Sequence, residues 1–529
     1  MLTTFTAPAF AGTWYIEDGD ITISAGESGN NVTQNENTTE NDPDTIITNR
    51  EEGASSHTVT IDAKDKDDKV EVTLKDVNID ASSRSEAAVS VTGKGDTTIE
   101  LDGDNELQGG DRHAGLEHNQ TVDSEGNVTS GKLTIQDDND NAGSLTATGG
   151  YFGAGIGGGS AKAGQVTITG GTITAISGDG AGIGGGQGNM GSNAGNADIE
   201  ISGGTIEATG GYTSAGIGGG YYGDATIKIT GDAVIKNATG GTFGAGIGGG
   251  GGGNGDVTIS GNAKIENAQG GYAGSGIGGG YGASGTVAIK DDSTVTATGG
   301  EVGAGIGGGV GGLADITIEG NATVNATGGE SSIDEESGEK IPGGAGIGSG
   351  AGDAKANITL EGKVTIVAKA GEGNAAIGDM NGEQVFTGLD GSITRYDSEG
   401  NDTTLPTDPG HPVPVPASPS SSGGGSADAS VQESVFPGLV VTDKDGQRIS
   451  YTSIRGNNVL SLRVGRFTAS LHASLSTLRQ LRAEGIDTIT FQTILCSTTL
   501  SVDELLAMGG EDAEAVLTHR FTASSLTVG

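Results

Sequence analysis

Cysteine and long apolar runs are nearly absent from this chain of 529 residues. The single cysteine, Cys496, rules out an intrachain disulfide framework. No segment approaches the roughly 18 apolar residues that a bilayer-spanning helix needs, so we expect no membrane insertion. The chain must therefore be stabilised by packing alone.

Positive charge is also scarce. The 27 Lys and Arg residues stand against 69 Asp and Glu, which gives a formal net charge of -42. This excess makes nucleic acid and anionic membranes poor partners and divalent cations plausible ones.

Glycine is abundant, and it recurs in a fixed pattern. The stretch Gly-Ala-Gly-Ile-Gly-Gly-Gly at 153–159 returns along the chain, mostly every 27–34 residues, as a small residue, any residue and an aliphatic residue. The copies are Ala154/Ile156, Ala181/Ile183, Ala215/Ile217, Ala245/Ile247, Ser275/Ile277, Ala304/Ile306, Ala345/Ile347 and Ala375/Ile377, preceded by the weaker Ala87/Val89 and Ala114/Leu116. A period of this size predicts a solenoid, whose units bury apolar faces only against their neighbours.

Two further segments in each period alternate apolar and polar residues, as half-buried strands do. Examples are V-T-I-T-G-G at 166–171 and L-T-A-T-G-G at 145–150. Three short strands and three glycine-rich corners in each turn predict a parallel β-helix of about ten coils.

Composition divides the chain into four parts. Residues 1–12 look like the remnant of a secretory signal, which predicts an extracellular or cell-surface location. Residues 13–400 form the β-helix with an atypical N-terminal cap, and the Pro/Gly/Ser-rich residues 401–430 form a linker. Residues 431–529 form a small α+β domain of unknown role, with a helix expected at 470–484 from leucines at helical spacing.

The repeats suggest a binding surface. If Ala and Ile point inward, the glycine between them points outward, and stacked turns would present a face nearly bare of side chains. Eight aromatic residues border that face and are candidate ligand-binding residues: Tyr151, Phe152, Tyr212, Tyr221, Tyr222, Phe243, Tyr272 and Tyr281. A bare strip edged with rings suits a polysaccharide. Alternatively, glycine only permits tight corners and the rings fill gaps in a thin core.

Acidic clusters are candidate calcium ligands. Asp102, Asp104 and Glu106 alternate through an expected turn, and Asp138 and Asp140 begin another acidic loop. Carboxylate oxygens are the ligands that Ca²⁺ prefers. The alternative is that these turns are simply solvated.

Enzymatic chemistry has few candidates. Polysaccharide lyases of this architecture typically use an Arg or Lys base beside calcium-holding carboxylates, but residues 151–390 contain no Arg, His or Cys. Arg112 and His113, beside Asp111, are the best candidates. We therefore expect a protein that is not an enzyme.

The runs V-T-L-K-D-V-N-I-D-A at 72–81, A-A-V-S-V-T-G at 87–93 and T-I-E-L-D-G-D-N-E-L at 98–107, followed by the glycine repeats, resemble a family of secreted bacterial carbohydrate-binding β-helix proteins. The resemblance covers about residues 14–400. It implies a right-handed parallel β-helix, bound calcium, no catalysis and a polysaccharide ligand of pectic or cellulosic type. A structural or adhesive stalk presenting residues 431–529 is the alternative, and a polysaccharide lyase or hydrolase is a third hypothesis.

Overall fold

The computed structural model describes residues 12–139, 141–188, 195–333, 340–352, 354–386, 388–410, 439–444, 446–449, 451–456, 458–464, 468–493, 497–508, 513–520 and 523–529. The chain divides into two compact units, a large one that includes residues up to 398 and 403–411, and a small C-terminal one. The proposed signal remnant lies, except for Gly12, outside the described residues.

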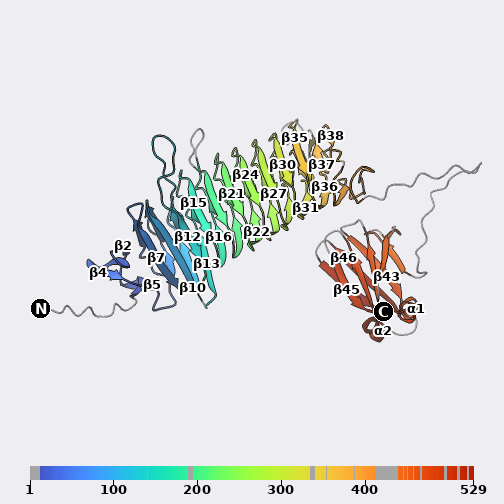
Figure 1. Ribbon diagram of the computed structural model, residues 1–529, viewed down its shortest axis with the longest axis horizontal. Coiled ribbons are helices and arrows are strands. Elements are labelled where there is room, and N and C mark those ends of the chain that lie inside the picture. Colours follow the sequence, from blue (N-terminus) through green and yellow to red (C-terminus); the bar gives the residue numbers. More distant parts are fainter. Residues whose placement is uncertain are drawn as a thin grey trace, which may run out of the picture. The chain divides into compact units, whose positions relative to one another are not determined.

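The large unit is a parallel β-solenoid of about 14 turns (Figure 1), which confirms the predicted fold and is longer than the ten coils expected. Equivalent strands of successive turns pair in parallel along three ladders. The first ladder contains β1 (Thr13–Tyr15), β5 (Thr45–Thr48), β7 (Lys69–Lys75), β10 (Asp96–Gln108), β12 (Leu133–Gln136), β15 (Gly164–Ile168), β18 (Ala197–Ile201), β21 (Ala225–Ile229), β24 (Gly255–Ile259), β27 (Gly285–Ile289), β30 (Ala314–Ile318) and β35 (Ala356–Leu360).

The second ladder follows the first around the corner of each turn. It contains β8 (Asn78–Asp80), the second half of β10, β13 (Gly143–Thr148), β16 (Thr172–Ile176), β19 (Thr205–Thr209), β22 (Val234–Thr239), β25 (Lys264–Gln269), β28 (Thr294–Thr298), β31 (Thr323–Thr327), β36 (Thr365–Lys369) and β39 (Ser392–Tyr396).

The third ladder, here called the glycine ladder, contains the repeated Ala-Gly-Ile-Gly segments. Its strands are β2 (Ile21–Ala25), β6 (Val59–Ala63), β9 (Val89–Gly93), β11 (Leu116–His118), β14 (Ile156–Gly157), β17 (Ile183–Gly184), β20 (Ile217–Gly218), β23 (Ile247–Gly248), β26 (Ile277–Gly278), β29 (Ile306–Gly307), β34 (Ile347–Gly348) and β37 (Ile377–Asp379). The isoleucines pair in register, for example Ile217 with Ile247, and both are fully buried.

The core follows directly from this register. Isoleucine, valine and alanine of all three ladders point inward and form one continuous cluster along the solenoid. Burying an isoleucine side chain contributes about 1.5–3 kcal/mol, and the stacking repeats this contribution in each turn.

Both ends of the solenoid carry irregular strands. At the start, after the 3₁₀ turn Ile16–Asp18, β3 (Asn30–Gln34) and β4 (Asn37–Asp42) add to β2 in antiparallel fashion. At the far end β38 (Gly382–Glu383) pairs antiparallel with β37. An insertion between β31 and β34 carries the hairpin β32 (Ser331–Ile333) and β33 (Lys340–Pro342). The antiparallel strands β3 and β38 cover the end strands of the glycine ladder, whose edges would otherwise be free to pair with other chains.

The small unit has its own core. One sheet contains β40 (Leu439–Thr442), β43 (Thr468–Ser474), β46 (Glu514–Arg520) and β47 (Ala523–Val528). The other contains β41 (Thr452–Gly456), β42 (Val459–Arg463), β44 (Thr488–Gln492) and β45 (Ser497–Ser501). The helices described are α1 (Leu475–Ala483) and α2 (Val502–Met508).

The helix predicted over 470–484 is therefore too long. Ser474 caps α1 by accepting a hydrogen bond from the Thr477 amide, and the residues before it belong to β43. Leu471 matches the helical spacing, but in the structure it alternates with Ala469 and Ala473 on the buried face of that strand.

Candidate functional site

The glycine ladder is not the exposed bare strip that the repeat pattern suggests. Gly155 and its equivalents are buried. A Cβ atom added at Gly246 would lie 2.7 Å from the Gln269 nitrogen and 2.8 Å from the Ala238 oxygen, both backbone atoms of the second ladder. The prediction of an outward bare face is wrong because the chain folds back tightly after each second-ladder strand and brings the glycine against that strand's end.

The glycine after each isoleucine is required by its conformation. From Gly157 to Gly348, φ at this position lies between +127° and +146°. The small residue that begins each repeat, such as Ala245, donates a backbone hydrogen bond from its nitrogen to the Gly249 oxygen at 3.0 Å. We call the tight turn closed by this hydrogen bond the glycine arch. Only glycine adopts this conformation without a steric cost, so the alternative reading of the glycines, as residues that permit tight corners, is the correct one.

Two loops leave the glycine ladder in each turn and cover it. The first loop precedes the arch, as at 149–153, and the second follows it, as at 158–163. The first loop of one turn accepts a backbone hydrogen bond from the second loop of the next, as at Phe243 oxygen and Tyr281 nitrogen, 2.8 Å apart. The same contact joins Arg112 to Ser160, Phe152 to Gln187, Thr213 to Gly251, Ala273 to Val310 and Val302 to Ala351. We call these paired loops the roof.

All eight predicted aromatic residues lie on the roof loops. Tyr151, Phe152, Tyr212, Phe243 and Tyr272 lie on first loops, whereas Tyr221, Tyr222 and Tyr281 lie on second loops. The exposed fractions of Tyr151, Tyr212 and Tyr281 are 60%, 59% and 50%. The rings therefore border not a bare strip but the outer surface of the roof.

Five of these residues come together over three turns. The rings of Tyr212 and Phe243 are 5.6 Å apart in an edge-to-face arrangement, and those of Phe243 and Tyr281 are 5.4 Å apart. The neighbouring rings of Tyr221 and Tyr222, with centroids 4.1 Å apart and planes inclined by 41°, complete the group. Tyr221, Tyr222, Phe243 and Tyr281 line a groove of about 390 Å³ with the small residues Gly251, Gly252 and Gly282. We call this the aromatic groove.

The other rings have different surroundings. Tyr151 and Phe152 contact each other, at 4.4 Å between centroids. The Tyr272 hydroxyl lies 2.9 Å from the Ser332 hydroxyl on the inserted hairpin. Phe243 also packs against a small apolar cluster of Ala273, Val302 and Ala351 under the roof, so this ring has a structural role as well.

The predicted calcium ligands do not converge. Asp102, Asp104 and Glu106 lie not in a turn but within β10, which continues around the corner through Gly103 at φ +67°. Asp102 instead forms an ion pair with Lys75, at 2.7 Å. Asp138 is exposed, whereas Asp140 lies outside the described residues. No group of three His, Cys, Asp or Glu residues able to hold a metal occurs in the part of the chain that the structure describes.

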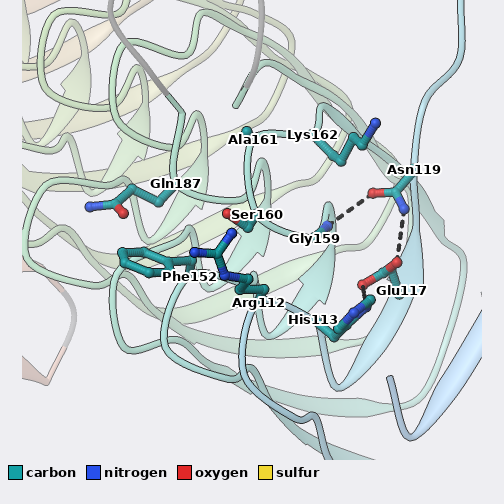
Figure 2. Close-up of a pocket in the computed structure, with 10 residues that line it drawn as sticks. All are labelled: Arg112, His113, Glu117, Asn119, Phe152, Gly159, Ser160, Ala161, Lys162 and Gln187. Atoms are coloured by element: carbon teal, nitrogen blue, oxygen red, sulfur yellow. Dashed lines mark hydrogen bonds and ion pairs between the residues drawn. The ribbon is translucent and has the colours of Figure 1, made fainter. Parts of the chain in front are cut away.

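Arg112 and His113 line a second pocket, of about 460 Å³ (Figure 2). Lys162 and Ser160 from the second loop of the next turn join them, together with Phe152 and Gln187. We call this the cationic pocket. Sequence reasoning missed Lys162, because it lies 50 residues from Arg112 and only the stacking of turns brings them together.

A hydrogen-bonded chain forms one wall of the cationic pocket. Glu117 accepts hydrogen bonds from His113 at 2.8 Å, from the Ala114 amide at 3.1 Å and from Asn119 at 2.8 Å, and Asn119 in turn accepts one from the Gly159 amide. The hydrogen bond to Glu117 raises the pKa of His113 against the opposing effect of partial burial. The sequence contained no signal for Glu117, whose alternation with apolar residues resembles an ordinary strand position.

The Beta helix repeat family matches residues 141–160, 166–187, 199–221 and 287–310, all within the solenoid. No curated protein and no solved structure matches the chain. The helices of the described residues are too short and too polar to span a membrane. These matches support a parallel β-helix repeat protein.

Proposed function

We propose that the solenoid binds an extracellular polysaccharide at the aromatic groove without cleaving it. The observation that carries this proposal is the run of contacting rings, Tyr212, Phe243 and Tyr281, over successive turns of the roof. Aromatic rings present flat apolar faces on which the C–H faces of sugars stack, while hydroxyl groups stay solvated. Ordered backbone loops hold these rings in place, which lowers the entropy cost of binding.

The groove also has the dimensions of a ligand site. Its volume of about 390 Å³ lies in the range typical of small-ligand pockets, and glycine at three of its lining positions leaves the rings accessible. A polymer extends beyond such a site, so the remaining roof would contact neighbouring sugar units.

Affinity electrophoresis of the full chain in gels containing pectin, xylan or a cellulose derivative tests this function. We expect at least one polymer to retard the protein, and Tyr212→Ala with Tyr281→Ala to weaken retardation about tenfold, which corresponds to ~1–2 kcal/mol. Repeating the gels with a chelator tests whether retardation depends on calcium. No reducing or unsaturated ends should be released.

Leu313→Ala is the matched control, because Leu313 is 56% exposed and apolar but not aromatic. Retardation by no polymer, or equal retardation of the double variant and the wild type, would contradict the proposal. Loss in both the double variant and the Leu313 control would indicate general apolar adhesion instead.

A further inference from the structure

The cationic pocket gathers positive charge in a protein that has little of it. Arg112, His113 and Lys162 line one cavity, although acidic residues outnumber basic ones 69 to 27 in the chain. Cations in such a protein are expected to pair with nearby carboxylates. A group of them around an open cavity therefore indicates a ligand of opposite charge.

The carboxylate of this pocket is already occupied. The Glu117 side chain is only 8% exposed, and its oxygens accept hydrogen bonds from His113, the Ala114 amide and Asn119. It fixes the His113 ring and is not directed at the guanidinium of Arg112 (Figure 2). The same hydrogen bond raises the pKa of His113, and Glu117 balances the charge of the protonated ring.

Arg112 and Lys162 are weakly neutralised. The Arg112 side chain is 67% exposed, and its nearest carboxylate, Asp111, lies at 4.0 Å, the outer limit of an ion pair. Lys162 forms no ion pair with any residue that the structure describes. The planar guanidinium matches the two oxygens of a carboxylate or sulfate group, and a charge-assisted pair of this kind is stronger than a neutral hydrogen bond.

The pocket also offers groups for a sugar ring. Phe152 lies 5.8 Å from the Arg112 guanidinium and supplies an apolar wall, while Ser160, Asn119 and Gln187 supply polar groups for hydroxyls. We propose that the cationic pocket binds an anionic sugar unit through Arg112 and Lys162, which line the same cavity, with its ring against Phe152.

This inference rests on the proposed function for the ligand being a polysaccharide, but it concerns a separate site. The roof contact of Phe152 with Gln187 and that of Phe243 with Tyr281 are separated by three turns, about 14 Å at the strand spacing of a β-sheet. One oligosaccharide of a few units can therefore reach both the cationic pocket and the aromatic groove. The cationic pocket would then select charged polymers over neutral ones.

Isothermal titration calorimetry of the full chain tests the proposal. The probes are a hexuronic acid tetramer, a neutral hexose tetramer of the same linkage and its sulfated form, at physiological salt. We expect Arg112→Gln and Lys162→Gln each to weaken binding of the charged probe at least about tenfold and to leave the neutral probe unchanged. The stronger of the uronate and sulfate probes identifies the anion.

Lys228→Gln is the matched control, because it removes one positive charge from β21, away from the pocket. Equal affinity for charged and neutral probes, or equal loss in the control and the pocket variants, would overturn the inference. The proposed function can fail separately. If no polymer retards the wild type but the charged probes still bind the variant Tyr212→Ala with Tyr281→Ala, the aromatic groove is rejected as a binding site and the cationic pocket is not. A shift of the His113 ring resonances on adding the charged probe provides a second readout.

Discussion

At the scale of single residues, His113 and Glu117 provide a test of the cationic pocket. The pKa of His113 is raised mainly by its hydrogen bond to Glu117, with smaller contributions from the charges of Glu86 and Asp111. We expect an NMR titration to place this pKa above the ordinary value of about 6.5. Glu117→Gln should lower it, because the acceptor carboxylate is then neutral.

The sign of the pH dependence follows from this shift. A histidine whose pKa is higher in the folded state stabilises the fold fully below its unfolded pKa, and that contribution disappears as pH rises through the folded pKa. The loss of unfolding free energy caused by His113→Gln should therefore be larger at acidic than at alkaline pH. A pKa of His113 that is unchanged in Glu117→Gln would disprove the assignment of the shift.

At the scale of elements, a substitution in the glycine arch distinguishes a tightly packed glycine ladder from an exposed strip. Gly246→Ala should destabilise the solenoid by about 1–3 kcal/mol, since its Cβ would overlap backbone atoms that cannot move independently. Guanidinium unfolding, with hydrogen exchange of peptides covering β23 and β26, measures the loss. Gly53→Ala is the control, because a Cβ there meets nothing within 4 Å. Equal stability of the two variants would mean that the ladder is not tightly packed.

The repeated isoleucines were sufficient to predict the ladders, because each faces its own equivalent in the next turn and any shift of register would expose it. The roof could not be predicted in this way. Its contacts are backbone hydrogen bonds, such as that between Phe243 and Tyr281, and backbone groups leave no trace in the pattern of side chains. The same pattern therefore placed the aromatic residues near the glycines but beside a bare surface, whereas they lie on the loops of the roof.

The spacing of acidic residues did not predict a metal site correctly. Asp102, Asp104 and Glu106 alternate as metal ligands in a loop would, but alternation is equally the period of a strand. The backbone follows the strand, so the side chains line up along β10 instead of converging on one point. The cationic pocket shows the reverse case, in which Arg112 and Lys162 are far apart in sequence but line the same cavity.

At the scale of the whole molecule, a solenoid is held together by contacts between neighbouring turns, and its ends are its weak points. The far end is closed by Arg395 of β39, whose side chain is fully buried and forms two hydrogen bonds to Asp408, at 2.6 and 2.9 Å. Arg395 also contacts Glu383 and the carbonyl oxygen of Gln384. These contacts hold residues 403–410 against the last turns of the solenoid. Composition alone had assigned these residues to the linker.

Arg395→Met should therefore loosen the end of the solenoid rather than the whole. Removing one partner of a buried ion pair leaves Asp408 uncompensated and costs about 3–5 kcal/mol. Because each turn contacts only its neighbours, hydrogen exchange should accelerate in β36 and β39 and stay unchanged in β21 and β24. Asp408→Asn added to Arg395→Met should recover part of the protection, since the fully buried side chain at position 408 is then neutral. Arg482→Met, in exposed ion pairs with Asp487 and Asp503, is the control and should leave the solenoid unaffected. Uniform acceleration along all turns would instead show that the solenoid unfolds as a single cooperative unit.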